Sequence, residues 1–298
     1  MQFDAHCIEC LVGREFRLAA ERRDGEASFH FMKDVLRTVL DAPAGVGAPY
    51  LVPGFTAAYH RYFGPGDPYA QLRRDSNDYV LRLLPELREQ VLRSPDPLRL
   101  ALQFSRTGNF LDFGVLTKEI VDRELARAIR QTPESPLDED EYAHFLADLE
   151  RAKRLLIIGD NAGEIVFDEL LVEALHRRYP ALHVAYAVRG GDAQNDATCE
   201  DARYTGMDRL AEIVDSGCTI PGTELACCGE ALRAAVQSAD VLLAKGQGNF
   251  ETLIRCGYNV YYIFLCKCER LSRLLNKPLM TGMFLNERRI PPFSPYAW

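Results

Sequence analysis

The sequence predicts an α/β protein in which a helical N-terminal region precedes a mainly parallel sheet with helices on both of its faces. In the first half, apolar residues recur at the three- and four-residue intervals of amphipathic helices. In the second half, short apolar runs alternate with helix-like stretches, as in chains of β-α-β units. An acidic segment with two prolines, residues 132–141, separates the halves. We therefore place the domains at residues 1–135 and 136–298.

Apolar spacing predicts helices in four stretches of the first half: residues 29–42, 69–93, 96–110 and 117–129. Pro85 lies inside the second stretch and predicts a kink or a break there, because proline lacks the N–H that a helix needs. Asp96 and Pro97 open the third stretch, which ends near Gly108. The glycine- and proline-rich segment 42–54 is predicted to be a loop.

Short apolar runs predict five strands in the second half: residues 154–160, 182–190, 210–217, 239–246 and 259–266. Residues 162–180 and 229–239 fill two of the gaps with helical patterns. Strands that alternate with helices form parallel sheets covered on both faces. Such sheets bind ligands at the carboxyl ends of their strands, so the site is expected there.

The composition of the 298 residues, with 47% hydrophobic and 26% charged side chains, is typical of a soluble globular protein. A net charge of −8 disfavours nucleic acid and anionic membranes as partners. No apolar run is long enough to span a bilayer, and the N-terminus does not resemble a secretory signal. Nine cysteines, an odd number, then predict reduced thiols and a cytoplasmic location. The oligomeric state is left open.

Polar residues follow three of the predicted strands. Asp160 and Asn161 follow the first, and the second is followed by Arg189 and then by Asn195 and Asp196. Carboxylate and amide oxygens suit Mg, Mn and similar hard cations. The fourth strand is followed by Lys245 and by Gly246, Gln247, Gly248 and Asn249, a turn whose N–H groups can face an anion. A cation beside an anion cradle is what phosphoryl hydrolysis requires.

Each of these features also has a purely structural interpretation. Asp160 or Asn161 can cap the next helix, and so can Asn195 or Asp196 before theirs. The Gly-Gln-Gly sequence can be a tight turn, and a lysine at a strand end is usually solvated. A dinucleotide-binding fold is disfavoured, because neither glycine-rich loop has the G-x-G-x-x-G spacing.

Three segments, "GDNAGEIVFDELL", "VRGGDAQNDAT" and "AKGQGNFETL", resemble the signatures of the metal-dependent damage-control phosphatases, long grouped as a domain of unknown function. The helical segments "DPYAQLRRDSNDYVLRLLPELRE" and "ALQFSRTGNFLDFG" are similar to those that precede the phosphatase domain in that family. The resemblance runs from Cys7 to about Lys267. It implies a helical N-terminal region packed on a Rossmann-like three-layer α/β/α domain, and hydrolysis of small phosphorylated metabolites such as sugar phosphates.

The resemblance also implies roles for individual residues. Asp160, Asn161 and Asp196 would bind a divalent cation, with Mn, Co, Ni and Mg as candidates. Asp160, Asp196 and Lys245 would be catalytic. The residues that would contact substrate or phosphate are Asn109, Asp112, Glu164, Arg189, Asn195, Lys245, Gly246, Gln247, Gly248 and Asn249. Whether Asp160 or a metal-bound water attacks phosphorus is left open.

The chain departs from the family pattern in two places. Thr219 stands in "GCTIPGT" where the family often has an acid, and the segment "GGDAQNDAT" lacks the usual hydrophobic or proline-containing stretch before Asn195. Both departures are expected to affect substrate choice. Neither removes a predicted metal ligand.

Two other functions compete with hydrolysis. A Rossmann-like sheet with a carboxylate after its first strand could bind S-adenosylmethionine, and the resemblance implies an S-adenosylmethionine-dependent carboxyl methyltransferase as the alternative enzyme. Methyltransferases usually have a glycine-rich turn after this strand, and this chain has Asp160 and Asn161 there. Cys7 and Cys10 form one C-x-x-C pair, which also tends to open the stand-alone prokaryotic members of the resembled family. A second metal site or a redox role is therefore considered for them, and a non-catalytic thiol-metal-binding module is the other alternative.

Overall fold

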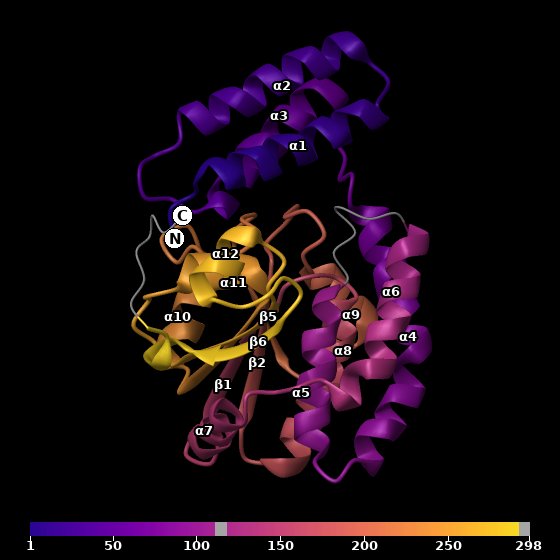
Figure 1. Ribbon diagram of the computed structural model, residues 1–298, viewed down its shortest axis with the longest axis vertical. Coiled ribbons are helices and arrows are strands. Elements are labelled where there is room, and N and C mark those ends of the chain that lie inside the picture. Colours follow the sequence, from indigo (N-terminus) through magenta and orange to yellow (C-terminus); the bar gives the residue numbers. More distant parts are fainter. Residues whose placement is uncertain (111–117, 292–298) are drawn as a thin grey trace.

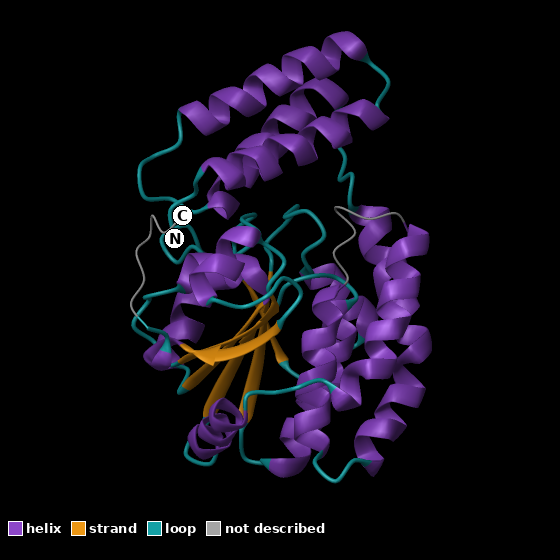
Figure 2. Ribbon diagram, viewed as in Figure 1, coloured by secondary structure: helices purple, strands orange, loops and turns teal. Residues whose placement is uncertain are grey.

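The computed structural model describes residues 1–110 and 118–291, and at 118–124 it describes the backbone alone. Within these ranges one six-stranded sheet is flanked by helices on both faces, and a bundle of three helices lies beyond the carboxyl ends of the parallel strands (Figures 1 and 2). The predicted α/β class, with a helical N-terminal region and a mainly parallel sheet, is confirmed. No helix in the described ranges is long and apolar enough to cross a membrane.

The sheet has the order β3-β2-β1-β4-β5-β6. Its five parallel strands are β1 (Arg154–Ile158), β2 (His183–Val188), β3 (Glu212–Asp215), β4 (Val241–Lys245) and β5 (Val260–Leu265). All five were predicted. An edge strand, β6 (Gly282–Asn286), runs antiparallel to β5 and was missed, because its few apolar residues follow a turn and show no long run. The order reverses between β1 and β4, which makes the carboxyl ends of these strands a switch point for ligands.

One face of the sheet is covered by α8 (Glu164–Arg178), which follows β1 directly. α4 (Ala70–Arg93) and α5 (Pro97–Thr107) pack on α8 from outside, and α7 (Glu139–Leu149) covers β5 and β6. α8 is buried on nearly all sides because it lies between the sheet and these helices. α6 (Lys118–Gln131) and α9 (Cys199–Thr205) lie beside this layer.

The opposite face is covered by α10 (Glu230–Ser238), α11 (Gly246–Leu253) and α12 (Glu269–Leu275). Alternate residues of the strands divide between the two cores: Leu155 and Ile157 face α8, whereas Leu156 and Ile158 face the second layer. Strands buried on both faces explain the continuous apolar runs of the sequence.

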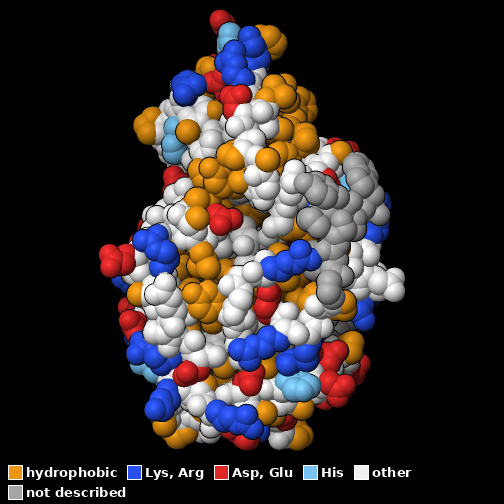
Figure 3. Space-filling view, turned by 90° about the vertical axis from the view of Figure 1, so that its left-hand side faces the viewer, with side chains coloured by type: hydrophobic (Ala, Val, Ile, Leu, Met, Phe, Trp, Pro, Cys, Tyr) orange, Lys and Arg blue, Asp and Glu red, His pale blue; other side chains and the backbone are white. Residues whose placement is uncertain are grey.

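The N-terminal bundle consists of α1 (Ala5–Glu21), α2 (Gly25–Leu40) and α3 (Val52–Phe63) and has a core of its own. Figure 3 shows hydrophobic side chains on its surface, where Phe16, Phe29, Leu36 and Leu40 are exposed. The hydrophobic cores thus separate α1–α3 from the rest, whereas α4 and α5 share the core of the sheet. The domain boundary near residue 135 stays a prediction.

Two local predictions differ from the structure. α4 continues through Pro85 without the break that was one of the two predicted outcomes, and the predicted kink stays a prediction. Residues 246–249 do not form an isolated turn but the first turn of α11, which begins directly after β4. Gly246 makes this abrupt transition possible, since its φ of 76° is strained for other residues.

We expect Phe145→Ala to lower the free energy of unfolding by about 3–5 kcal/mol. Phe145 is fully buried between α7 and the sheet, where its ring packs edge-on against those of Tyr261 and Phe284. Phe29→Ala is the matched control, because that ring is 63% exposed, and should cost less than about 1 kcal/mol. Urea unfolding measures both, and similar losses in the two variants would contradict this account of the core.

Candidate active site

A large cavity lies where the sheet and the N-terminal bundle meet. It has a volume of about 1150 Å³, and its wall includes residues of α1 on one side and Asp160, Asn161 and Asp196 on the other. The three polar residues follow β1 and β2 at the switch point of the sheet. The cavity therefore lies at the carboxyl ends of the strands, where the sequence predicts the site.

Asp160 is held from two sides. Its Oδ2 accepts hydrogen bonds from Nδ2 of Asn109 at 2.9 Å and from Nδ2 of Asn161 at 2.8 Å. Its Oδ1 accepts none from any residue in the described ranges, although the side chain is 9% exposed and lies in the cavity wall. Asn109 comes from the end of α5, and its Oδ1 accepts from the backbone N–H of Leu265 after β5. One amide thus connects Asp160 to a strand two places away.

Asn161 and Asp196 face each other through an isolated antiparallel bridge between the loops that follow β1 and β2. Nδ2 of Asn195 donates to Oδ1 of Asn161 at 2.6 Å, and the backbone N–H of Ala197 donates to the carbonyl of Asp160. These contacts hold the second loop against the first. They bring together residues that lie more than thirty positions apart in the chain.

The proposed capping roles of these residues are excluded. α8 has Gly163 as its N-cap residue, with no side-chain cap, and α9 is capped by Thr198 in a box with Asp201. Neither Asp160 nor Asp196 is therefore engaged at a helix start. Both side chains line the cavity instead, and the Asp196 carboxylate is close enough to Asp160 to raise its pKa.

The electrostatics of Asp160 are unfavourable without an added positive charge. Burial raises the pKa of Asp160 well above its ordinary value, and the nearby carboxylates of Asp196 and Glu164 raise it further. The cations Arg189 and Lys267 act in the opposite direction but do not outweigh these effects. The site therefore concentrates negative charge that a bound cation would neutralise.

Lys245 lies beneath the cavity floor and is fully buried. Its ammonium donates to Glu164 Oε1 at 2.5 Å, to Asp168 Oδ1 at 2.8 Å and to the carbonyl of Ser105 at 3.1 Å. Burial opposes its charge, but the carboxylates of Asp168 and Glu164 hold the pKa of Lys245 above its ordinary value. All three N–H groups are used, so contact with a phosphate would require one of these bonds to break.

Arg189 is buried in the same way on the other side. Its Nε donates to Asp196 Oδ2 at 2.7 Å, and its Nη2 donates to Oδ1 of Asn249 at 3.1 Å. Asn249 in turn donates to the carbonyls of Gly159 and Lys245. Arg189 and Asn249 therefore fix the ends of β1, β2 and β4 relative to one another.

The start of α11 touches the site directly. A Cβ on Gly246 would clash with the carboxylate of Asp160, so this position requires glycine for space as well as for φ. Gln247 and Gly248 line the cavity. The first N–H groups of a helix have no intrahelical partner, which makes this end of α11 suitable for an anion.

The predicted site residues divide into two sets. Those that line the cavity are Asn109, Asp160, Asn161, Asn195, Asp196, Gln247 and Gly248. Those that support them from below or behind are Glu164, Arg189, Lys245, Gly246 and Asn249. Asp112 lies outside the described residues.

Three supporting residues were missed by sequence reasoning. Asp168 bonds Lys245, Ser105 and Tyr186, and it follows Glu164 by four residues in an apolar helix, a spacing that signals a shared face. Asn77 on α4 accepts from the N–H of Gly163, and Arg73 donates to the carbonyl of Gln194. Buried polar residues inside α4 gave no such local signal.

The two cysteines of the C-x-x-C pair also line the cavity, on α1 of the N-terminal bundle. Cys7 is buried beside Arg270, whose Nη1 lies 3.5 Å from its sulfur, and Cys10 is exposed. Burial raises the pKa of Cys7 to about 12, which disfavours the thiolate that binds metals and attacks disulfides. In the described ranges no three His, Cys, Asp or Glu side chains are grouped to hold a metal. The metal or redox role of Cys7 and Cys10 stays a prediction.

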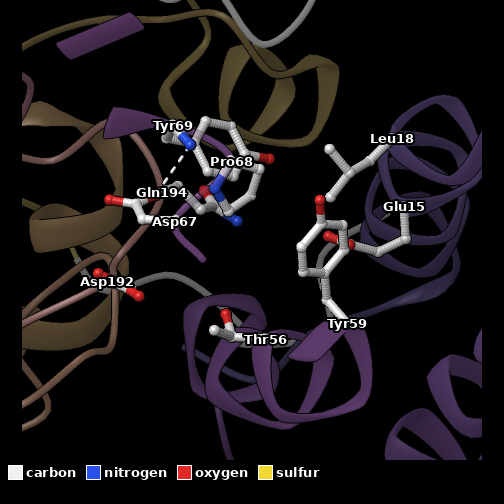
Figure 4. Close-up of a pocket in the computed structure, with 9 residues that line it drawn as sticks. All are labelled: Glu15, Leu18, Thr56, Tyr59, Asp67, Pro68, Tyr69, Asp192 and Gln194. Carbon is white, nitrogen blue, oxygen red and sulfur yellow. Dashed lines mark hydrogen bonds between the residues drawn. The ribbon is translucent and has the colours of Figure 1, made fainter. Parts of the chain in front are cut away.

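A second, small cavity lies between the bundle and the loop that carries Asp196. Figure 4 shows Glu15 and Tyr59 of the bundle on one side and Asp192 and Gln194 of the loop on the other. Its volume of about 20 Å³ holds roughly one water molecule. The bundle therefore packs closely on this loop.

The residues present fit a hard divalent cation. Asp160, Asn161 and Asp196 provide only oxygen ligands, and the free Oδ1 of Asp160 is available in the cavity. The carboxylates of Asp196 and Glu164 lie near Asp160 and raise its pKa, and a bound cation would offset this repulsion. With two carboxylates and one amide, the remaining ligand positions would be left to water or substrate.

Comparison with known proteins places this chain in a family. The family profile described as the damage-control phosphatase ARMT1-like domain matches residues 4–281. An uncharacterized protein of Methanocaldococcus jannaschii is 32% identical over 279 residues, which cover 89% of this chain and 89% of that protein. A damage-control phosphatase of Archaeoglobus fulgidus is 29% identical over 285 residues, covering 92% and 95%. Another, of Pyrococcus horikoshii, is 28% identical over 221 residues, covering 74% of each.

A solved structure has the same fold. The crystal structure of a DUF89 family protein of Pyrococcus horikoshii superimposes with a TM-score of 0.83, covering 96% of this chain and 99% of that one. The sequence identity is 24%, so the likeness concerns the architecture.

Gly246→Ala is expected to destabilise the protein more than Gly257→Ala. The two glycines have similar φ values, 76° and 84°, so both variants carry a similar backbone strain of about 1 kcal/mol. Only at Gly246 would the new methyl group clash with Asp160, since the space around Gly257 is open. Chemical unfolding should show an extra loss of about 1–3 kcal/mol for Gly246→Ala. Equal losses would mean that Asp160 is not held against α11.

Asp160→Asn is expected to stabilise the protein at pH 7 when divalent cations have been removed. Folding raises the pKa of Asp160, so the folded chain holds this proton more tightly than the unfolded chain. Wild-type stability therefore falls as the pH rises from the ordinary carboxyl pKa toward the raised one, and the amide avoids this loss. Thermal unfolding in EDTA should show a higher Tm for the variant at pH 7 and no difference near pH 4. A more stable wild type at pH 7 would contradict the assignment.

Proposed function

This chain belongs to the damage-control phosphatase ARMT1-like domain family, and on that basis we propose that it hydrolyses small phosphorylated metabolites with the help of a divalent cation. The relatives named damage-control phosphatases support the reaction class. The observation that carries the proposal is the buried carboxylate of Asp160, which has a free oxygen in the cavity and lies among other carboxylates. Sugar phosphates are the substrates we propose to examine first.

In this proposal Asp160, Asn161 and Asp196 hold the cation, with Mn, Co, Ni and Mg as candidates. The cation, when bound, would draw charge from the phosphoryl group and lower the barrier to attack on phosphorus. Arg189 fixes the Asp196 carboxylate through an ion pair with its Oδ2. Asn109 and Asn161 likewise orient Asp160 through its Oδ2 and leave Oδ1 free.

The start of α11 would hold the phosphoryl oxygens. Gln247 and Gly248 line the cavity next to Asp160, and the N-terminal end of a helix favours negative charge. Lys245 contributes indirectly in this arrangement, because its ammonium fixes Glu164 and Asp168 under the site. Asn195 positions Asn161 through a hydrogen bond of 2.6 Å.

The carboxyl methyltransferase alternative has less support. Such an enzyme would need space for its cofactor directly after β1, where Asp160 and Asn161 are held by Asn109, Asn195 and the start of α11. The phosphatase accounts for the clustered carboxylates, whereas methyl transfer would leave their electrostatic cost without a purpose.

The test is phosphate release from p-nitrophenyl phosphate and a panel of sugar phosphates with Mg, Mn, Co or Ni. Asp160→Asn should lower kcat/KM by about 10²–10⁴-fold, because it removes a ligand charge and keeps the shape. Asp192→Asn is the matched control, since Asp192 lies on the same loop as Asp196 but has a 41% exposed side chain. Its activity should stay within about twofold of the wild type.

Two results would contradict the proposal. Metal-dependent turnover retained in Asp160→Asn would move the chemistry away from the end of β1. No turnover with any metal or ester would leave the family assignment intact but remove the hydrolytic function.

A further inference from the structure

Arg106 is a buried cation in the cavity wall that the proposed reaction does not use. It lies near the end of α5, three residues before Asn109, and is 4% exposed. Its Nη2 donates to Oγ of Ser135 at 2.9 Å, and its Nη1 lies 3.4 Å from the carbonyl of Gly282. Both acceptors are neutral. The guanidinium has five N–H donors, so most of its capacity is unused.

No carboxylate in the described ranges compensates this charge. Burial lowers the pKa of Arg106 to about 10, and the other influence on it, Arg99, is also a cation that lowers it. At pH 7 the guanidinium is still charged. A buried charge without an opposite partner is strongly unfavourable, so proteins keep one where a ligand supplies the partner.

Arg106 lies on the β6 side of the cavity, away from the carboxylates. A Cβ on Gly282, at the start of β6, would touch the guanidinium, which places Arg106 over this strand. Gly282 pairs with Leu265 of β5, whose N–H binds Asn109, and Asn109 binds Asp160. β6 lies three strand intervals from β1 in the sheet, and strands are about 4.8 Å apart, so the guanidinium lies on the order of 14 Å from Asp160.

The cavity between these two ends is larger and more apolar than a simple hexose phosphate requires. Leu11, Val52, Phe110, Leu125 and Met280 contribute to its wall. Its volume of about 1150 Å³ is at the upper end of small-molecule sites. The space suits an extended molecule with a polar group at each end.

We propose that Arg106 binds a second anionic group of the substrate, so that the preferred substrates are phosphomonoesters with a carboxylate or a second phosphate at the end of the molecule opposite the reacting phosphate. This inference rests on the proposed function, because the reacting phosphate is placed at Asp160. A planar guanidinium with free donors is suited to either anion, and both are bound in a forked geometry. Arg106 is thus a specificity-determining residue.

The test compares three substrates: glucose 6-phosphate, 6-phosphogluconate and fructose 1,6-bisphosphate. Arg106→Gln should lower the preference for the two-anion esters over glucose 6-phosphate, as a ratio of kcat/KM, by about tenfold to hundredfold. The change should lie mainly in KM. A larger fall in kcat/KM for 6-phosphogluconate would indicate that Arg106 binds a carboxylate, and a larger fall for fructose 1,6-bisphosphate would indicate a second phosphate.

Two further variants separate binding from packing. Arg88→Gln, which breaks an ion pair with Glu173 outside the cavity, should leave the preference unchanged. Arg106→Lys keeps the charge and should retain part of the preference. Arg106→Gln should also unfold at the same or a higher temperature than the wild type, because it removes an uncompensated charge, whereas a packing role predicts a lower Tm.

Binding can be measured without turnover. Calorimetry would give the affinity of each of the three compounds for Asp160→Asn and for the Asp160→Asn, Arg106→Gln double variant. An equal loss for all three compounds would place Arg106 at the reacting phosphate, and no loss would leave it without a binding role. Either result overturns the inference. If the wild type hydrolyses none of the esters but the binding preference still depends on Arg106, only the hydrolytic function fails.

Discussion

The arrangement of the site is governed by the repulsion between carboxylates that lie close together at the end of β1. Asp160, Glu164 and Asp196 come from two loops and the start of a helix, and they converge at the point where the strand order reverses. Such an arrangement destabilises the fold unless opposite charges are supplied. Lys245 and Arg189 supply two of them from fully enclosed positions, which leaves Asp160 as the acid whose Oδ1 accepts no hydrogen bond within the described residues.

The surrounding elements serve this centre in different ways. α5 provides Asn109, which spans from Asp160 to the backbone of β5, and the start of α11 packs its glycine against the carboxylate. The N-terminal bundle closes the cavity from outside and rests on the loop that carries Asp196. The helical region is therefore part of the site. Its contribution is part of the cavity wall, to which α1 supplies residues opposite the strand ends.

The sequence was sufficient for the fold class, the five parallel strands and the residues at their ends, because each is a local pattern with a fixed period or position. It was insufficient wherever a contact depends on distant segments. Lys245 reads as a solvated or phosphate-binding lysine, and only its burial beneath α5 and α8 shows that its three donors are already used. Arg106 looks like any other arginine in the sequence, and only the packed structure shows that no carboxylate among the described residues pairs with it. β6 was missed for a local reason, since its few apolar residues form no long run, and the helical start at Gly246 was missed because the sequence pattern of a tight turn is the same.

The most direct test of the central claim is the location of a bound cation in crystals grown with Mn²⁺, by anomalous diffraction at the manganese edge. The account predicts one strong peak within about 2.0–2.3 Å of oxygens of Asp160, Asn161 and Asp196, and loss of that peak in Asp160→Asn. A peak at Cys7 and Cys10, or an empty site between the three oxygen ligands at saturating Mn²⁺, would contradict it.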